Sequence, residues 1–250
     1  MTSLPDSPGP LPRPRAVLLD LDDTIIESGP GADVAWREAC EAEAARSVGT
    51  DLEALIEGVL RIREWFWADP ERHRRGRTDP IPANTAIAAQ ALGELGHEEE
   101  LARGIATGYR ARRDTQVLIF PGALETLDWL RAEGFVTALV TNGNHGDQQA
   151  KIERFDLARH FDLIWIEGER GVGKPEIETY LGVLEGLALA PSDAWFVGDN
   201  IEWDVRAPQS LGMQGVWVSA TAEPPPAGVQ PDATIAALGE LRALLTTGGG

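Results

Sequence analysis

Short apolar runs and longer amphipathic stretches alternate along much of the chain. The first run, Ala16–Leu19, is apolar at four consecutive positions and is followed directly by Asp20. A run without polar alternation is typical of a strand buried on both faces. Four later runs have the same character, namely Phe135–Val140, Leu163–Ile166, Trp195–Val197 and Gly215–Val218. The pattern therefore predicts five buried strands.

Helical spacing fills the intervals between these strands. In Gly122–Arg131 the leucines recur three positions apart, with Pro121 before the segment and Gly134 after it. The other helices are expected at Asp147–Phe155, Pro175–Leu187, Asp204–Leu211 and around Ile235–Leu245. Strands that alternate with helices favour a parallel sheet covered by helices on both faces.

The segment 31–116 has a different pattern, with no buried strand. Its helical stretches, separated by Gly and Pro, are Asp33–Arg46, Asp51–Ala68, Ala83–Leu95 and Glu98–Arg113. We therefore predict an α/β protein with a Rossmann-like core, formed by residues 15–30 and 117–247, and an inserted helical subdomain at residues 31–116. Residues 1–14 are Pro-rich and are expected to form a flexible tail.

Composition narrows the classes of partner. The formal net charge of −18 argues against binding to nucleic-acid polymers, which depends on cationic surface. No apolar run reaches the roughly 18–20 residues of a membrane span, and the N-terminus lacks the pattern of a secretory signal. Cys40 is the only cysteine, so no internal disulfide forms, and we expect a cytoplasmic protein. A monomer and a homodimer are both compatible with the sequence.

Polar side chains follow the predicted strands. They are Asp20, Asp22 and Thr24 after the first strand, Thr141 and Asn142 after the second, Lys174, and Asp199 and Asp204. The carboxyl ends of parallel strands share one edge of a sheet, so these residues are expected to converge there. Buried carboxylates need compensation, and a divalent cation with oxygen ligands provides it. The pattern therefore predicts a metal-assisted site around Asp20.

Together these motifs resemble those of the haloacid dehalogenase (HAD) superfamily of phosphohydrolases. The match consists of Asp20-Leu-Asp22-Asp-Thr24, Thr141-Asn142, Lys174-Pro175 and Gly198-Asp199-Asn-Ile-Glu-Trp-Asp204, in the family's order, and covers roughly Arg15–Leu245. The helical insertion resembles that superfamily's type-1 cap. Thr141–Gly143, Phe161–Gly168 and Gly198–Asp204 look most like the branch of pyrimidine nucleotidases and N-acylneuraminate-9-phosphatases.

This resemblance implies a role for each acidic residue. Asp20 would attack phosphorus and form an aspartyl-phosphate. Asp22 would protonate the leaving oxygen and later deprotonate the hydrolytic water. Mg²⁺ would be held by the Asp20 side chain, the backbone carbonyl of Asp22 and Asp199. Asp204 and Thr24 would act on these groups indirectly.

The remaining motif residues would bind the phosphoryl group. Thr141 and the backbone amide of Asn142 would hold phosphate oxygens at the start of a helix. Lys174 would neutralise charge on the phosphoryl group and on the nucleophile. The implied substrate is a small phosphorylated metabolite, with nucleotide monophosphates and sugar phosphates, including sialic-acid phosphates, as the leading examples.

Several local patterns have two interpretations. The run from Gly168 to Lys174 has the glycine and lysine positions of a P-loop, but Pro175 stands where that motif needs Ser or Thr, so we reject it. Arginines crowd residues 61–77 beside Trp65 and Trp67, and they form either a solvated helix face or a substrate-binding surface. His145 either lines the site or lies exposed. Pro208 falls near the first turn of its helix or kinks it. The arginines are Arg61, Arg63, Arg72, Arg74, Arg75 and Arg77.

Three other functions remain open at this stage. A phosphosugar mutase would use the same four motifs. A haloacid dehalogenase would share the nucleophile, but it characteristically lacks the second carboxylate that Asp22 provides here. A non-catalytic phospho-acceptor domain would also combine acids, Thr and Lys around Mg²⁺, but it has no place for a large helical insertion.

Overall fold

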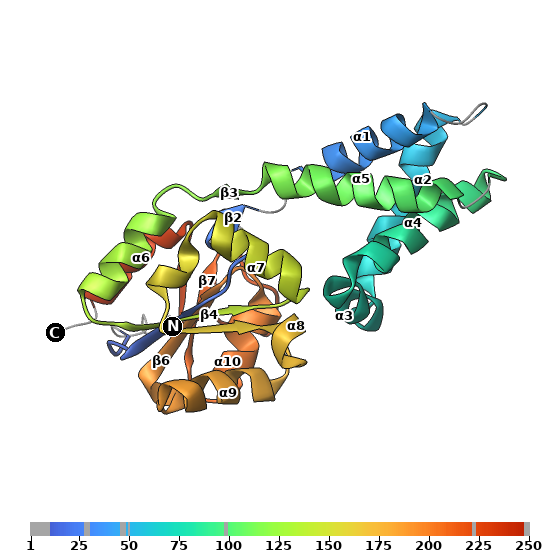
Figure 1. The fold of residues 1–250 in the computed structure, drawn as a ribbon. Helices are drawn as coiled ribbons and strands as arrows, with labels where there is room; N and C mark the ends of the chain where they lie inside the picture. Colours follow the sequence, from blue (N-terminus) through green and yellow to red (C-terminus); the bar gives the residue numbers. More distant parts are fainter. Residues whose placement is uncertain are drawn as a thin grey trace, which may run out of the picture.

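The computed structural model describes residues 11–27, 31–45, 49, 51–97, 100–221 and 224–247. A sheet surrounded by helices forms one part, and an elongated group of helices extends from it (Figure 1). We call the helices α1–α5 the cap and the rest the core. Of the tail predicted for residues 1–14, the first ten lie outside the described residues, whereas Leu11 packs against the core.

One parallel sheet of six strands forms the core, in the order β5-β4-β1-β6-β7-β8. Its strands are β1 (Ala16–Leu19), β4 (Val136–Thr141), β5 (Leu163–Ile166), β6 (Ala194–Gly198), β7 (Gln214–Val218) and β8 (Ala233–Ile235). The predicted α/β fold class is confirmed. Because Leu19 of β1 pairs with Leu139 of β4 and Val197 of β6, the residues that follow these three strands meet at one edge.

Helices cover both faces of this sheet. They are α6 (Ala123–Ala132), α7 (His145–Arg154), α8 (Glu167–Arg170), α9 (Ile177–Leu187), α10 (Ala207–Ser210) and α11 (Leu241–Thr247). Val17 and Leu19 of β1 pack on the side of α6, α7 and α11, while Ala16 and Leu18 pack on the side of α9 and α10. The alternation of side chains along β1 thus builds two apolar clusters, one on each face. Figure 1 shows α6 and α7 on one side of the sheet and α9 and α10 on the other.

Two expectations for the C-terminal part are corrected. The predicted helix around Ile235–Leu245 is preceded by an unpredicted strand, β8, and a short 3₁₀ turn at Leu238–Glu240. β8 has only three residues, too few to form a recognisable apolar run, and its pairing with the exposed edge of β7 determines its conformation. The helix predicted from Pro175 begins at Ile177 instead. Further 3₁₀ turns lie at Leu157–His160 and Pro191–Asp193.

The helix predicted over Asp204–Leu211 has two parts. A π-helical segment, Ile201–Arg206, leads into α10, where Pro208 lies in the first turn. Proline has no amide N–H to bond a carbonyl of the preceding turn, and the Trp203 carbonyl of that turn accepts a hydrogen bond from the Tyr180 hydroxyl. Pro208 therefore leaves the preceding Asp204 segment helical.

The cap consists of five helices between two short strands. They are α1 (Ala32–Ala44), α2 (Leu52–Ala68), α3 (Pro70–Thr78), α4 (Pro80–Glu94) and α5 (Glu100–Gln116). The apolar faces of α1, α2, α4 and α5 meet in a separate cluster, where Trp36 stacks on Tyr109 with ring centroids 4.1 Å apart. Cys40 is buried there, and burial raises the pKa of its thiol to about 12.

Helix α3 has no counterpart among the predicted elements. Its sequence, PERHRRGRT, contains no large apolar residue, so it lacks the periodicity that identifies a helix. The Asp69 side chain accepts a hydrogen bond from the Arg72 amide at 2.8 Å, and Pro70 occupies the first turn. This capping starts the helix where a Pro-containing break was expected.

A two-stranded antiparallel ribbon joins the cap to the core. It pairs β2 (Ile26–Glu27) with β3 (Leu118–Ile119), one strand at each end of the inserted helices. Among the described helices, none combines the length and the apolar character needed to cross a membrane.

Candidate active site

Three charged residues from separate parts of the sequence form the centre of the site. Lys174 Nζ lies 2.8 Å from Asp20 Oδ1 and 2.7 Å from Asp204 Oδ1, and all three side chains are buried. Burial raises the pKa of Asp20 well above its usual range, and Asp204 and Asp199 add to this effect while Lys174 opposes it. Burial alone would lower the pKa of Lys174, but the two carboxylates outweigh it and raise that pKa.

A cluster of carboxylate oxygens at the same place fits a hard divalent cation. Oxygen atoms of Asp20, Asp199 and Asp204 lie within 4.8 Å of one another. Burial, together with the charges of Asp204 and Asp23, raises the pKa of Asp199 to about 7. One lysine does not balance three acids, two of which are buried, and an oxygen-only donor set is the kind that Mg²⁺ prefers. The structure thus adds Asp204 to the acids near the predicted metal position.

Asp22 lies beside a different cation. Lys151 Nζ is 2.7 Å from Asp22 Oδ1, and Gln148 Nε2 donates to Asp22 Oδ2 at 2.8 Å. Burial would raise the pKa of Asp22, but Lys151 and Gln148 outweigh it and lower that pKa. The chain turns after Asp22, with Asp23 at φ 55°, and the Asp20 and Asp22 side chains both line the same cleft.

Sequence reasoning missed Lys151 and Gln148. Both lie on α7, three residues apart and therefore on one helix face. Gln148 Nε2 also donates to Thr141 Oγ1 at 2.5 Å, and Lys151 Nζ donates to Gln148 Oε1 at 2.7 Å. The sequence signal for these two residues is a polar pair three positions apart in the helix that follows the Thr141-Asn142 motif.

The loop after β4 contains the predicted phosphate-binding residues. Thr141 ends the strand and is buried beside Gln148. The Asn142 side chain accepts from the Lys174 amide at 2.7 Å and donates to the Lys174 carbonyl at 2.6 Å. Asn142 therefore fixes the backbone that carries Lys174, in addition to the expected use of its own amide.

Two other candidates lie away from the cleft. Thr24 is buried, and its hydroxyl has no hydrogen-bond partner among the described residues. His145 is exposed at the start of α7, so the exposed alternative is the one observed. Neither is among the described residues that line the cleft.

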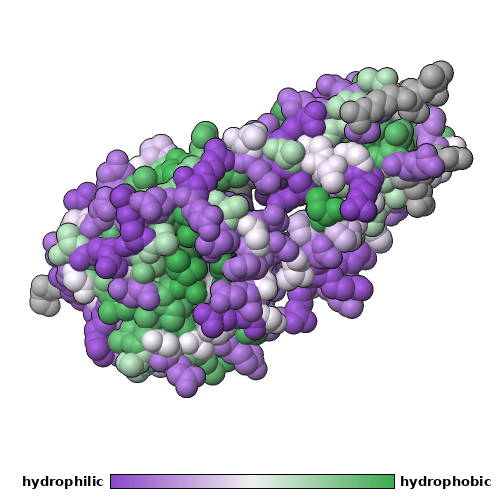
Figure 2. All heavy atoms as spheres, viewed as in Figure 1, coloured by the Kyte–Doolittle hydropathy of each residue, from purple (hydrophilic) through white to green (hydrophobic). Residues whose placement is uncertain are grey.

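A cleft of about 460 Å³ separates this edge of the core from the cap. Figure 2 shows the core on the left and the cap on the right, with a hollowed region where the two meet. From the cap, Arg63, Arg77, Arg110 and Arg113 line the cleft, together with the rings of Trp67 and His73. The cleft therefore places cations of the cap opposite the acids of the core.

The arginine-rich stretch is divided between the two interpretations. Only Arg63 and Arg77 of its six arginines line the cleft. Arg61 and Arg75 pair with acids of the cap itself, and Arg72 stacks on the exposed Trp65. Arg110 and Arg113 were not predicted, because their place in the cleft depends on how α5 packs.

Comparison with known proteins identifies the family. The family model described as haloacid dehalogenase-like hydrolase matches residues 14–212. The chain is 30% identical over 244 residues to a phosphoserine phosphatase of Thermus thermophilus, covering 91% of this chain and 97% of that relative. A pyrimidine 5′-nucleotidase of Escherichia coli is 33% identical over 126 residues, covering 50% of this chain and 56% of that relative.

A solved structure shares the fold. A HAD-hydrolase from Bacillus subtilis, bound to magnesium, superposes with a TM-score of 0.72 at 22% identity, covering 93% of this chain and 99% of that one. The likeness to nucleotidases, predicted from three motif stretches, extends over half of the chain. The family model and these relatives agree with the predicted phosphatase class, and the chain belongs to the haloacid dehalogenase-like hydrolase family.

Proposed function

We propose that this protein is a Mg²⁺-dependent phosphomonoester hydrolase that forms an aspartyl-phosphate on Asp20. One observation carries the proposal: Asp20 lies 2.8 Å from Lys174 at the edge of the sheet, and Asp22, Thr141 and Asn142 line the same cleft. A nucleophile, a charge-neutralising cation, an acid/base carboxylate and phosphate-binding groups are thus available within one site.

The chemistry proceeds in two displacements. An Asp20 oxygen bonds to phosphorus while the bond from phosphorus to the leaving oxygen breaks, and Asp22 gives its proton to that oxygen. Asp22 then takes a proton from water, whose oxygen attacks the same phosphorus and breaks its bond to Asp20, releasing inorganic phosphate. Asp22 is charged while Lys151 contacts it, so the first proton transfer requires that this ion pair loosen when substrate binds.

Mg²⁺ would be held by Asp20, Asp199 and the backbone carbonyl of Asp22, with Asp204 beside them. When bound, it would shield the anionic phosphoryl group from the attacking carboxylate. Lys174 balances Asp20 before attack and the phosphoryl oxygens during it, and Thr141 with the Asn142 amide orients those oxygens. Asp204 holds Lys174 in place.

The substrate is proposed to be a small phosphorylated metabolite, such as a nucleotide monophosphate or a sugar phosphate, and the similarity to a phosphoserine phosphatase adds phosphoserine. Residues 31–116 would shield the cleft as a cap on a core of residues 15–30 and 117–247. A cytoplasmic location and a monomeric or homodimeric state remain predictions from the sequence.

The test is release of inorganic phosphate from para-nitrophenyl phosphate and a panel of metabolites, with Mg²⁺, with EDTA and in Asp20→Asn. We expect turnover that depends on Mg²⁺ and disappears in the variant. Transfer of phosphate between positions of a phosphosugar, without net release, would favour the mutase. Release of halide from a 2-haloacid with no phosphate release would favour the dehalogenase.

A further inference from the structure

Helix α3 of the cap ends in a buried ion pair with the core. Arg77 Nε donates to Glu167 Oε2 and Arg77 Nη2 donates to Glu167 Oε1, both at 2.8 Å. The two side chains are only 11% and 4% exposed, so solvent screens this pair little. A planar guanidinium that meets a carboxylate through two parallel bonds also fixes the orientation of both groups.

Glu167 in turn holds the loop that follows β4. Its Oε2 accepts a hydrogen bond from the Gly143 amide at 3.0 Å, and the Gly143 carbonyl accepts from the Gly168 amide at 3.0 Å. Gly143 has φ +122°, a conformation that residues with a side chain rarely adopt. The loop 141–143 therefore keeps its shape through Gly143 and through a carboxylate that the cap neutralises.

The same guanidinium reaches the segment that carries Lys174. Arg77 Nη2 donates to the Lys174 carbonyl at 3.2 Å, and the side-chain Nδ2 of Asn142 donates to that same carbonyl at 2.6 Å. The Arg77 guanidinium also lies over the Trp203 ring, 5.0 Å from its centroid. One cap residue thus contacts the segments that follow β5 and β6 and the segment that presents Lys174.

We propose that Arg77 is a positioning residue. It neutralises Glu167, and through Glu167 and the Lys174 carbonyl it fixes the positions of the loop 141–143 and of Lys174 relative to each other. This inference rests on the proposed function, because its effect on rate requires phosphate to bind that loop. A buried carboxylate bonded to a loop that receives a phosphate dianion would repel the dianion unless a cation balanced it. Arg77 supplies that cation from the cap, so docking of α3 and assembly of the loop are one event.

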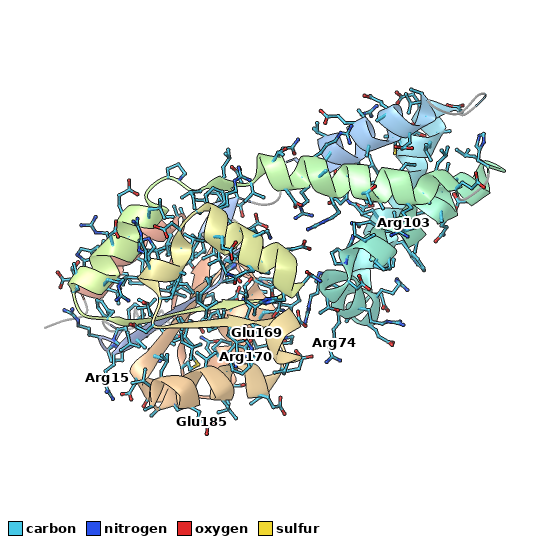
Figure 3. The ribbon with its side chains drawn as sticks, viewed as in Figure 1. Arg15, Arg74, Arg103, Glu169, Arg170 and Glu185 are labelled. Atoms are coloured by element: carbon cyan, nitrogen blue, oxygen red, sulfur yellow. The ribbon has the colours of Figure 1, made fainter. Side chains whose placement is uncertain are left out.

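The first experiment measures steady-state kinetics of Arg77→Met, of Arg77→Met combined with Glu167→Gln, and of the control Arg74→Met. Arg74 lies one turn earlier on α3 and pairs with Glu176 in a more exposed contact, and Figure 3 places it at the end of the cap that faces the core. We expect Arg77→Met to lower kcat/KM about 100-fold, because it leaves a buried charge unpaired. Arg74→Met should change it less than about threefold.

The double variant separates positioning from simple destabilisation. Removing the charge of Glu167 removes the repulsion, so the double variant should recover to within about tenfold of the unmodified protein. If Arg77→Met folds and has unmodified kinetics, or if the double variant is slower than Arg77→Met, the proposal is wrong. If Arg77→Met does not fold, Arg77→Lys replaces it, because lysine keeps the charge but cannot make the bidentate contact. Its kcat/KM should fall below that of the unmodified protein, but by less than the roughly 100-fold expected for Arg77→Met.

A second readout does not depend on turnover. Asn142-Gly143 is the single Asn-Gly step in the sequence, so labelling asparagine carbonyls with ¹³C and glycine amides with ¹⁵N isolates the Gly143 signal in a carbonyl-filtered NMR spectrum. We expect Arg77→Met to move this signal and Arg74→Met to leave it in place. A signal that moves in a protein without phosphatase activity would support the positioning role and refute the proposed function. An unmoved signal would overturn the positioning role itself.

Discussion

The two walls of the cleft, one formed by the core and the other by the cap, differ in where their charges are balanced. On the core wall, Lys174 Nζ lies 2.8 Å from Asp20 Oδ1 and 2.7 Å from Asp204 Oδ1. On the cap wall, Arg77 and Arg110 pair with acids that belong to the core. Charges of the core wall are thus balanced within the core, by groups that follow paired strands. Two charges of the cap wall, those of Arg77 and Arg110, are balanced across the cleft, whereas Arg63 pairs with Asp33 of the cap itself. The contacts among Asp20, Lys174 and Asp204 therefore do not involve the cap, whereas the loop 141–143 and the position of the cap depend on a few ion pairs across the cleft.

The choice of cation differs in the same way. The chain contains two lysines, Lys151 and Lys174, and both line the cleft from the core side. The cap uses arginine alone. An ammonium is a compact charge that can contact two carboxylates at once, as Lys174 does, while the arginine fork suits a bidentate contact such as that of Arg77 with Glu167. The lysine ammonium groups contact the carboxylates that we expect to react, and the arginine guanidinium groups make the contacts between the cap and the core.

The largest effect should follow from the removal of Lys174, the central cation of the core wall. We expect Lys174→Met to lower kcat by about 10³-fold or more, because buried Asp20 and Asp204 lose their shared partner. Thermal unfolding without Mg²⁺ should show a clear loss of stability, which added Mg²⁺ partly restores. The matched loss of a cap cation in Arg110→Met should reduce kcat less than tenfold. Equal losses in the two variants would contradict the distinction between the walls.

Removal of the other lysine should have an intermediate effect and change the pH profile. Lys151 lowers the pKa of Asp22, so Lys151→Met should raise that pKa. Because Asp22 must be protonated to act as the acid in the first displacement, the basic limb of kcat/KM should shift to higher pH. We expect a loss of about 10- to 100-fold at the optimum, since Asp22 keeps only its bond from Gln148. Lys151→Arg retains the charge and should keep the limb near its original pH. The idea fails if Lys151→Met reproduces the unmodified profile.

The acids of the core wall predict how stability depends on pH and metal. Asp199 has a pKa of about 7 in the folded protein and about 3.9 in an unfolded chain. Folding therefore takes up a proton between these values, and the stability of the metal-free protein should fall as pH rises from about 4 to 7. Mg²⁺ binds the charged form, so it should raise the unfolding midpoint by about 5 °C at pH 8 and by less at pH 5. In Asp199→Asn the metal effect should largely disappear, and an equal rise at both pH values would argue against this site.

The two walls also differ in how far the sequence predicted them. Asp20, Thr141 and Asp199 each follow a strand with a clear apolar run, and the parallel pairing of β1, β4 and β6 then brings them together. Arg77 lies on a helix without apolar periodicity, and Arg113 reaches the cleft only because α5 packs on α1 and α4. Local patterns encode strands and their ends, but they do not encode the placement of a helix by tertiary packing.

The smallest effect we expect concerns Arg113 and the choice of leaving group. Arg113 Nη1 donates to the Tyr109 hydroxyl at 2.9 Å, and no carboxylate among the described residues forms an ion pair with it. Burial would lower its pKa, but Tyr109 and the charges of Asp22 and Asp23 outweigh this and raise it. Its charge thus faces the carboxylate that we expect to meet the leaving oxygen.

Arg113→Met should therefore lower kcat/KM about tenfold for phosphomonoesters whose leaving group carries a carboxylate, such as phosphoglycolate, and less than threefold for para-nitrophenyl phosphate. Arg112→Met is the matched control, because Arg112 pairs with Glu38 inside the cap. If Arg113→Met slows both kinds of substrate equally, its charge serves only to balance Asp22. The charges of the cap wall would then position the cap without selecting the substrate, and only the core wall would act on the reacting groups.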